Sequence, residues 1–217
     1  MRILITSGAT REPIDAVRFL SNVSTGRTGA LIAEALARRN HAVTLLHGEA
    51  AVRPHSTPAA PVATEVFSST ANLQAQLHRL LGTGGFDAVI HCAAVSDYRP
   101  AETTAGKLSS YATELTLRLV PTPKLLPALK SYASHTARPL RVIGFKLTAG
   151  AGPAERSLAV GKLFAAGTVD AVIHNDMDDL ATGDARPFAA WRAGQPSPES
   201  LAGLDALTAW LHAFITA

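Results

Sequence analysis

The chain has 217 residues, of which 47% are hydrophobic and 17% are charged, so it can bury a substantial core as one domain. Its formal net charge is only +3, and the arginines are scattered rather than gathered into one stripe. Nucleic-acid binding, which usually needs a basic face, is therefore disfavoured. A pocket for a small anionic molecule fits the same mild positive excess.

The sequence shows no targeting or membrane-spanning signal. The N-terminal "MRILITSGAT" reads as a first strand rather than a signal peptide, and no window approaches the roughly 18 apolar residues of a membrane helix. Cys92 is the single cysteine, which excludes an internal disulfide and fits a reducing cytosol. The eight histidines are dispersed without the spacing of a zinc site. We therefore expect a cytoplasmic protein that does not bind membranes.

The predicted elements alternate between strand and helix along the chain. Short apolar, β-branched runs indicate buried strands, and apolar residues at helical spacing indicate helices. In chain order we expect a strand at 2–6, a helix at 30–40, strands at 41–48 and 86–95 with a helix at 71–85 between them, a strand at 114–120, a short helix at 123–133, a strand at 139–147, a helix at 154–167, a strand at 169–176 and a closing helix at 200–215.

Two segments depart from the buried strand and helix patterns. Residues 51–63 are rich in proline and alanine and are expected to form a surface connection. Residues 114–120 alternate apolar and polar side chains, which predicts an exposed or edge strand. The whole pattern predicts a single domain over residues 1–217 with an α/β, Rossmann-like, doubly wound fold. We expect a mostly parallel sheet, helices on both faces and an antiparallel edge strand suited to dimerisation.

Polar residues follow four of the predicted strands. They lie in the long loop from Gly8 to Asn22, at Ser96–Tyr98, at Lys146 and at Asn175–Asp176. Because ligands bind beyond the carboxyl ends of the strands in doubly wound sheets, these residues are the first candidates for a binding site.

The segment "STGRTG", residues 24–29, stands directly before the first helix. Its small residues and glycines, Ser24 and Gly26 among them, leave backbone N–H groups and the positive end of the helix dipole free to form a phosphate seat. Neither the G-x-G-x-x-G fingerprint nor the Walker A lysine motif is present. The alternative is that Gly26 and Gly29 serve only turn geometry and close helix–strand packing.

Three further residues each allow two interpretations. Ala93, at a strand end, would let a ligand approach the backbone closely. Asp97 could hold a metal ion near phosphates, or it could cap a turn or helix. Lys107 lies in "TAGKLSS", a glycine- and serine-rich stretch that could close over a triphosphate as a flap, or the lysine could simply be solvated.

Together and in this order, seven blocks resemble the phosphopantothenoylcysteine synthetase (phosphopantothenate–cysteine ligase) family of coenzyme A biosynthesis. The blocks are "SGATREPIDAVRFLSN", "STGRTG", "CAAVSDYRP", "GKLSS", "PTPKLL", "VIGFKL" and "VIHND". The resemblance implies that 4′-phosphopantothenate is activated by a nucleotide triphosphate, typically CTP and otherwise ATP, with Mg²⁺. A carboxylate is a poor electrophile, so it is first converted to an acyl-nucleotidylate with release of pyrophosphate. The amino group of cysteine then displaces the nucleotide.

The resemblance also implies roles for three catalytic residues. Asn22 matches the asparagine that serves conversion of the acyl intermediate to product, where its amide could bind the acyl-phosphate carbonyl. Arg18 matches an arginine suited to an anionic substrate group. Lys107 matches the first lysine of a flexible flap that acts on the phosphates.

For the nucleotide, the resemblance places Ala93 under the ligand, Asp97 near the metal and nucleotide, and Phe145 in packing contact. Asn175 and Asp176 fall near the cytosine or ribose. Asp97 is the candidate metal ligand. The full nucleotide-binding set is Gly8, Ser24, Gly26, Arg27, Ala93, Asp97, Phe145, Lys146, Asn175 and Asp176.

The flap departs from the family pattern, because "GKLSS" has Ser109 and Ser110 where the family has lysines. This departure would weaken triphosphate binding unless Lys146 or Arg27 supplies the missing charge. Many bacterial members carry an N-terminal flavin-dependent decarboxylase, whereas this chain begins at the ligase strand, so we expect no flavin. The resemblance further implies a homodimer and allows a separate phosphopantothenoylcysteine decarboxylase as a partner.

Two other functions compete with the ligase. A nucleotide-binding paralogue with an altered acid substrate or lost catalysis would explain the serine-rich flap. An NAD(P)-dependent oxidoreductase is disfavoured because the glycine fingerprint is missing and Tyr98 has no lysine four residues later.

Overall fold

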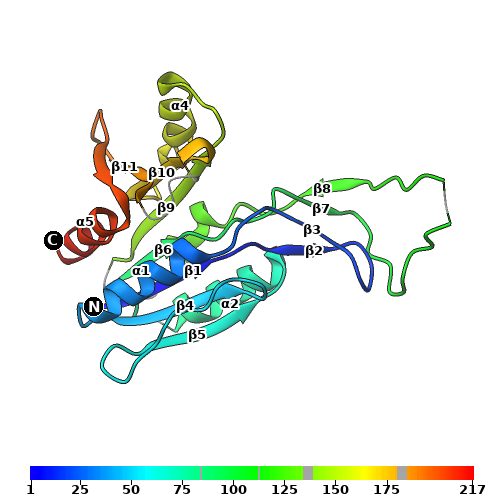
Figure 1. Ribbon diagram of the computed structural model, residues 1–217, viewed down its shortest axis with the longest axis horizontal. Helices are drawn as coiled ribbons and strands as arrows, with labels where there is room; N and C mark the ends of the chain where they lie inside the picture. The colour runs from blue at the N-terminus through cyan, green and yellow to red at the C-terminus, as the bar shows by residue number, and fades with distance from the viewer. Residues whose placement is uncertain (84, 112, 134–138, 180–184) are drawn as a thin grey trace.

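The computed structural model describes residues 1–217 except 84, 112, 134–138 and 180–184. Among the described residues, eight strands form one sheet in the order β12-β11-β10-β9-β6-β1-β4-β5 (Figure 1). The parallel strands are β1 (Arg2–Ser7), β4 (Ala42–Gly48), β5 (Val62–Phe67), β6 (Ala88–His91), β9 (Arg141–Thr148) and β10 (Ala171–Asp176). The chain winds outward from β1 in both directions, so the strand order reverses between β1 and β6. That reversal is the topological switch point at which doubly wound folds bind ligands.

Helices cover both faces of this sheet. On one face α1 (Arg27–Arg38) and α5 (Gly203–Thr216) pack over β1, β9 and β10. On the other face lie α2 (Thr70–Gly82), the 3₁₀ turn η1 (Leu126–Ala128), α3 (Leu129–Tyr132) and α4 (Pro153–Phe164). Residues Ile3, Leu4 and Ile5 of β1 are fully buried because successive side chains enter the two opposite cores.

An arm leaves the body of the molecule at the carboxyl edge of the sheet. It consists of residues 11–21, which form the hairpin of β2 (Arg11–Pro13) and β3 (Phe19–Ser21), and residues 98–121, which begin with β7 (Tyr98–Pro100) and end with β8 (Leu119–Pro121). Figure 1 shows these strands extending far from the helices and the main sheet. The long polar loop after β1 is therefore one half of this arm.

The predicted fold class is confirmed, but several strands differ from the sequence-based expectation. The strand expected at 114–120 is wrong, because only Leu119–Pro121 is a strand and it pairs with β7 outside the main sheet. The antiparallel edge is instead the hairpin of β11 (Pro187–Arg192) and β12 (Glu199–Ala202), which was missed. β5 was also missed: it lies at the opposite edge of the sheet, and its exposed residues dilute the apolar signal.

No helix in the described part of the chain is both long and apolar enough to cross a bilayer.

Candidate functional site

The connection from β1 to α1 crosses the carboxyl edge of the sheet at the switch point. Gly8 and Gly26 have positive φ angles of 82° and 74°, and a Cβ atom on either would lie 2.5 or 2.7 Å from the Cβ of Ala51. A Cβ on Gly29 would lie 2.4 Å from the Cβ of Ser7. These glycines therefore serve turn geometry and close packing, as the structural interpretation of "STGRTG" expects. Their packing brings the N-terminus of α1 down onto the end of β1.

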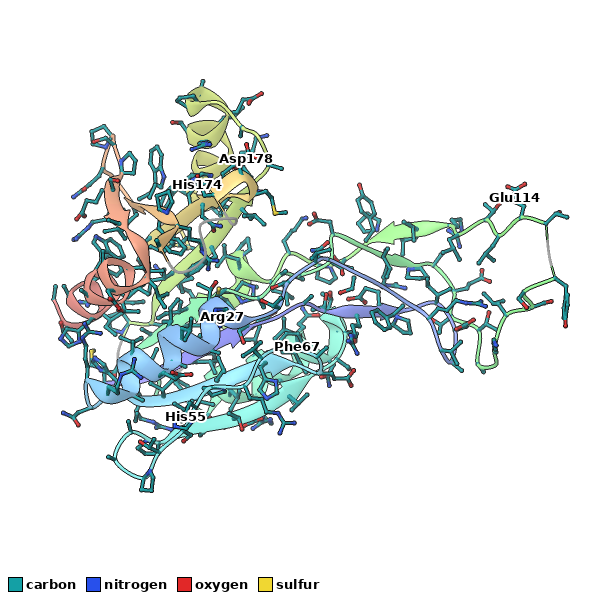
Figure 2. All side chains as sticks on the ribbon, viewed as in Figure 1. Arg27, His55, Phe67, Glu114, His174 and Asp178 are labelled. Carbon is teal, nitrogen blue, oxygen red and sulfur yellow. The ribbon has the colours of Figure 1, made fainter. Side chains whose placement is uncertain are left out.

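The N-terminus of α1 is bonded weakly by the residue before its N-cap, because Arg27 N donates to Thr25 Oγ1 at 3.4 Å. Its N-cap residue, Gly26, offers no side-chain acceptor, and the first turn contains no acidic residue. The first N–H groups of a helix lack partners within the helix, and the helix dipole makes this end positive. Arg27 begins the helix with an exposed side chain, which Figure 2 shows at the end of α1 that faces the arm. Ser24, two residues before Gly26, is half-buried.

Backbone bonds join the loops after β1 and β6. Ala94 N donates to Gly8 O at 2.8 Å, and Thr10 N donates to Ala94 O at 3.2 Å. Asn22 then crosses the same junction, because its Nδ2 donates to Val95 O at 3.1 Å. These bonds bring the exposed Asn22 amide to the loop that follows β6, two residues from Ala93.

Asp97 lies on the rim of this region and forms an ion pair with Lys124. Both side chains are 68% exposed, and Thr122 N donates to Asp97 O at 3.0 Å, which fixes the backbone between them. A metal ion at Asp97 would have to displace the lysine ammonium. Lys124 was quoted in a resembling block but was not predicted as a site residue, because nothing in its sequence neighbourhood shows a pairing across 27 positions.

Phe145 and Lys146 lie in the second half of β9, before its last residue Thr148. Phe145 packs, half-buried, against the core beneath α1 and α5. Just before it, a Cβ on Gly144 would lie 2.7 Å from Leu126 Cδ2, so the absence of a side chain lets η1 sit directly on the strand. Lys146 is half-buried and pairs in register with His174 of β10.

Asp176, at the end of β10, is fully buried and its carboxylate is committed to the protein. It accepts hydrogen bonds from Thr148 Oγ1 at 2.5 Å and from Gly150 N at 2.9 Å, and Arg156 lies 3.5 Å away. The Thr148 hydroxyl and the backbone N–H groups hold the pKa of Asp176 well below its usual range. The carboxylate thus shapes the turn that leads into α4. Its neighbour Asn175, the other predicted residue at this strand end, is half-buried.

His91 ends β6 and Cys92 follows it, and burial favours the non-ionised form of both side chains. His91 Nδ1 lies 2.9 Å from Thr6 Oγ1, and burial lowers the pKa of His91 to about 4. Burial raises the pKa of the Cys92 thiol to about 12, against a smaller opposing effect of Arg186. A thiol with so high a pKa is not a reactive nucleophile at neutral pH.

On the arm, a buried carboxylate clasps the two segments together. Asp15 accepts hydrogen bonds from Val17 N at 2.8 Å and Leu108 N at 3.0 Å, and it pairs with Arg18 Nη1 at 2.9 Å. The Val17 and Leu108 amides lower the pKa of Asp15 despite its burial. Arg18 is thus engaged by Asp15, and the exposed Lys107 adjoins the clasp through Leu108. The expected flap is therefore bonded to the loop of the opposite hairpin.

The structure divides the predicted site residues into two groups. Arg18 and Lys107 lie on the arm, whose far tip is marked by Glu114 in Figure 2. The remaining residues lie at or just beyond the carboxyl edge of the sheet; they are Gly8, Asn22, Ser24, Gly26, Arg27, Ala93, Asp97, Phe145, Lys146, Asn175 and Asp176.

A doubly wound sheet with a helix N-terminus at its switch point defines a Rossmann-like α/β protein, here distinguished by its arm. The chain belongs to the family described as the DNA/pantothenate metabolism flavoprotein C-terminal domain, whose sequence model matches residues 1–188. This membership confirms the resemblance in the seven sequence blocks.

Two curated relatives share the family. The coenzyme A biosynthesis bifunctional protein CoaBC of Escherichia coli (strain K12) is 38% identical over 149 residues, which are 67% of this chain and 34% of the relative. CoaBC of Thermococcus kodakarensis is 33% identical over 178 residues, 81% of this chain and 41% of that protein. The chain therefore spans between a third and a half of the length of these relatives.

Solved structures agree on the fold. The DNA/pantothenate metabolism flavoprotein of Streptococcus pneumoniae matches with a TM-score of 0.86 at 24% identity, covering 100% of this chain and 98% of the other. A Cab2 variant in complex with phosphopantothenate-cysteine matches with a TM-score of 0.79 at 18% identity, covering 99% and 87%.

Proposed function

We propose that this chain is a phosphopantothenate–cysteine ligase that acts in coenzyme A biosynthesis through an acyl-nucleotidylate. The observation that carries the proposal is the junction at the switch point, where Asn22 reaches across to Val95 near a helix N-terminus whose N-cap residue is Gly26. The family membership and the names of the curated relatives support the same activity. The proposal covers residues 1–217 as a single domain.

In this proposal the nucleotide lies over the carboxyl ends of β6, β9 and β10. Its phosphates approach the N-terminus of α1 at Gly26 and Arg27, where backbone N–H groups stabilise negative charge. The Asn22 amide would then donate a hydrogen bond to the acyl-phosphate carbonyl as cysteine attacks. Phe145 would pack against the base or ribose from the end of β9. CTP and ATP remain the two candidate nucleotides.

Mg²⁺ would be held mainly by the triphosphate. Within the described parts of the chain, no group of three or more His, Cys, Asp or Glu side chains could hold a metal. Mg²⁺ commonly keeps several waters and takes one or two carboxylates together with substrate phosphates. Asp97 fits such a single carboxylate if its exposed ion pair with Lys124 opens. Held there, Mg²⁺ would neutralise charge on the triphosphate and favour the departure of pyrophosphate when the acyl-nucleotidylate forms.

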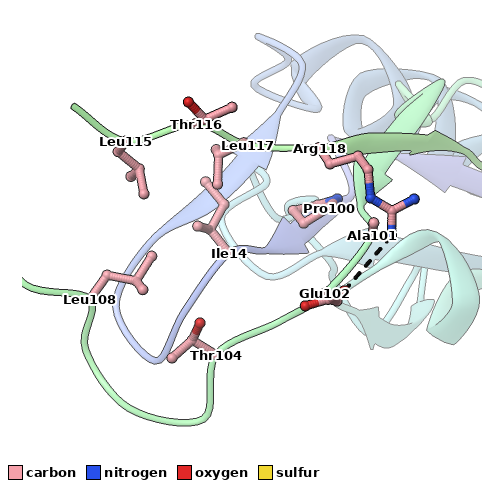
Figure 3. A pocket seen from close by; sticks show the side chains of 10 residues that line it. All are labelled: Ile14, Pro100, Ala101, Glu102, Thr104, Leu108, Leu115, Thr116, Leu117 and Arg118. Atoms are coloured by element: carbon pink, nitrogen blue, oxygen red, sulfur yellow. Dashed lines mark ion pairs between the residues drawn. The ribbon is translucent and has the colours of Figure 1, made fainter.

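We also propose that the arm packs against a second copy of the chain. The arm carries large apolar side chains that are strongly exposed in one copy: Val17, Phe19, Tyr98, Tyr111, Leu115, Leu117 and Leu119. Between its segments lies a cavity of about 240 Å³, lined by apolar residues such as Ile14, Leu108 and Leu115 and edged by the Glu102–Arg118 ion pair (Figure 3). Exposed apolar surface of this kind marks a contact site, and a two-fold arrangement would cover both arms.

A catalytically altered paralogue is the second candidate function. The observation that favours it is the flap, where Lys107 is followed by Ser109 and Ser110 and all three side chains are exposed. Such a protein would bind a nucleotide but would use another acid or none.

The deciding experiment incubates the protein with Mg²⁺, 4′-phosphopantothenate and either CTP or ATP, with and without cysteine. A ligase should release pyrophosphate only when phosphopantothenate is present and should form the cysteine amide, detected by mass spectrometry. Comparing CTP with ATP identifies the nucleotide in the same assay. Nucleotide binding without pyrophosphate release would contradict the ligase and favour the paralogue.

A further inference from the structure

Thr10 stands between β1 and β2, where the chain leaves the main sheet for the arm (Figure 1). The residue is fully buried, with 0% of its surface exposed. It is not among the predicted site residues, yet it contacts both sides of the hydrogen bond that Asn22 makes to Val95.

The Thr10 hydroxyl holds the peptide group that accepts the Asn22 hydrogen bond. Ser96 N donates to Thr10 Oγ1 at 3.0 Å, while Asn22 Nδ2 donates to Val95 O at 3.1 Å. The C=O of Val95 and the N–H of Ser96 belong to one planar trans peptide group, in which they point in opposite directions. Fixing the N–H therefore fixes the direction in which the carbonyl oxygen meets the Asn22 amide.

The Thr10 backbone holds the segment that carries Asn22. Ser21, directly before Asn22 in the chain, donates from its Oγ to Thr10 O at 2.8 Å. Thr10 N in turn donates to Ala94 O at 3.2 Å, in the loop after β6. One residue thus connects the donor and the acceptor of the Asn22 hydrogen bond to each other.

A series of buried hydroxyl groups keeps Thr10 itself in place. Thr10 Oγ1 lies 3.1 Å from Ser96 Oγ and 3.2 Å from Thr70 Oγ1, and both partners are buried. Thr70 begins α2, and its N and Oγ1 donate to Glu12 Oε1 at 2.9 and 2.6 Å. The network therefore ends at the first residue of a helix that packs on the main sheet, and a satisfied buried network of this kind holds one geometry.

We propose that Thr10 is a positioning residue for Asn22. A side-chain amide has two N–H donors, and the bond to Val95 O uses one of them. The second donor of the exposed Asn22 side chain then points in a direction that the Val95 carbonyl sets and the Thr10 hydroxyl maintains. The inference rests on the proposed function for the reaction step, in which that donor meets the acyl-phosphate carbonyl, but the orientation of Asn22 does not depend on ligase activity.

The kinetic test uses Thr10→Val, which replaces the hydroxyl with a methyl group of similar size. Amide formation should fall about 10-fold because Asn22 is misdirected, whereas pyrophosphate release should change by less than about 2-fold. The acyl-nucleotidylate should therefore accumulate, which rapid-quench sampling with mass spectrometry detects. Thr10→Ser keeps the hydroxyl and should restore amide formation.

A double variant separates positioning from a general effect on the fold. In an Asn22→Ala background, Thr10→Val should cause no further loss of amide formation, because no amide is left to position. A merely structural role would lower the rate by the same factor in both backgrounds. The matched control is Thr208→Val, which removes a hydroxyl from α5 at a residue that is 3% exposed, and it should leave the ratio of intermediate to amide unchanged.

A second readout needs no turnover. In ¹⁵N-labelled protein, the Asn22 side-chain amide resonances should shift in Thr10→Val and should stay in place in Thr10→Ser and Thr208→Val. If Thr10→Val does not fold, Ser21→Ala replaces it, because it removes the bond to Thr10 O at a half-buried position. Both readouts should then change in the same direction.

Unchanged amide formation, unchanged Asn22 resonances, or equal fold losses with and without Asn22 would each overturn the inference. The proposed function fails separately. If the wild type forms no amide, the ligase assignment is lost, and the Asn22 resonances still decide whether Thr10 positions that side chain.

Discussion

The body and the arm of this molecule are held together by different forces. In the body, side chains such as Ile5, Val142 and Ile173 are fully buried between the sheet and its helices. On the arm, Tyr111 is 95% exposed and Leu115 is 54% exposed, although both are large and apolar. Apolar burial therefore stabilises the body within one chain, whereas the arm depends on polar bonds and on whatever covers its apolar surface.

The polar bonds of the arm lie at its base and in its clasp. Glu12, only 2% exposed, accepts hydrogen bonds from Thr70 N at 2.9 Å and Thr70 Oγ1 at 2.6 Å, and so anchors β2 at the N-terminus of α2. Farther out, Asp15 joins Arg18 and Leu108. Two buried carboxylates thus fix the direction of a segment that has little core of its own.

The largest expected contrast concerns stability. Ile5→Ala should lower the free energy of unfolding by about 2–5 kcal/mol, because it leaves a cavity in a closed core. Leu117→Ala, at a site that is 39% exposed, should change it by less than about 0.5 kcal/mol in dilute protein. Urea denaturation of dilute protein measures the free energy of unfolding of both variants.

The same Leu117→Ala variant should weaken self-association, which sedimentation over a range of concentrations detects. Equal costs of the two substitutions in dilute protein would contradict the contrast between body and arm. Unchanged association would contradict the proposed packing of the arm against a second copy.

Activity should separate the two groups of site residues. Asn22→Ala, at the switch point, should still release some pyrophosphate but accumulate the acyl-nucleotidylate, with product formation falling about 100-fold as for loss of an oxyanion donor. Lys107→Gln, on the arm, should impair pyrophosphate release itself, by about 10-fold or more.

Rapid-quench sampling with mass spectrometry distinguishes the two blocked steps. Lys162→Gln is the matched control for Lys107, because it removes an exposed lysine from α4 in the body and should leave both steps intact. Normal turnover in Asn22→Ala would contradict the catalytic role that we assign to Asn22 in the loop after β1.

Acidification should affect the body through His91. Its folded-state pKa is lowered from 6.5 to about 4, so the unfolded chain binds the proton more tightly between these values. This contribution to stability is complete above pH 6.5 and is lost as the pH falls toward 4, by a total of about 3 kcal/mol. His91→Gln lacks it.

The difference in unfolding free energy between the wild type and His91→Gln should therefore shrink by about that amount between pH 7.5 and pH 4. Chemical denaturation at a series of pH values gives the difference directly. A difference that does not change with pH would show that burial of His91 does not govern its ionisation.

The smallest effect should be local to the arm. Asp15→Asn removes the carboxylate charge, so the amides of Val17 and Leu108 should exchange hydrogen faster while that of Ile5 stays protected. Because the folded pKa of Asp15 is lowered, the clasp is intact above the usual carboxyl range and loosens as the pH falls through the lowered value.

Hydrogen exchange followed residue by residue measures this loosening. Asp205→Asn, at an exposed position in the first turn of α5, is the control and should leave the arm unchanged. Faster exchange throughout the sheet would mean that the arm and the body unfold together.

The sequence by itself determined the class of fold and the edge of the sheet at which the site lies. Runs such as "RILIT" and "VIGF" carry a strong signal because they are buried on both faces, and the polar residues after them must then meet at the carboxyl edge. The sequence blocks also determined the family. The signal fails for β5 and β12, which lie at the two edges of the sheet and have exposed side chains.

Only the tertiary structure decided which side chains face each other. Arg186 reaches Thr28, Lys124 reaches Asp97, and Asp15 holds Leu108, over separations of 158, 27 and 93 residues. Local sequence patterns do not predict such pairs, because each pair depends on how the sheet and the arm bring distant segments of the chain together. The structure likewise assigned the Asp176 carboxylate to the fold, since four hydrogen bonds and an ion pair with Arg156 inside the protein occupy it.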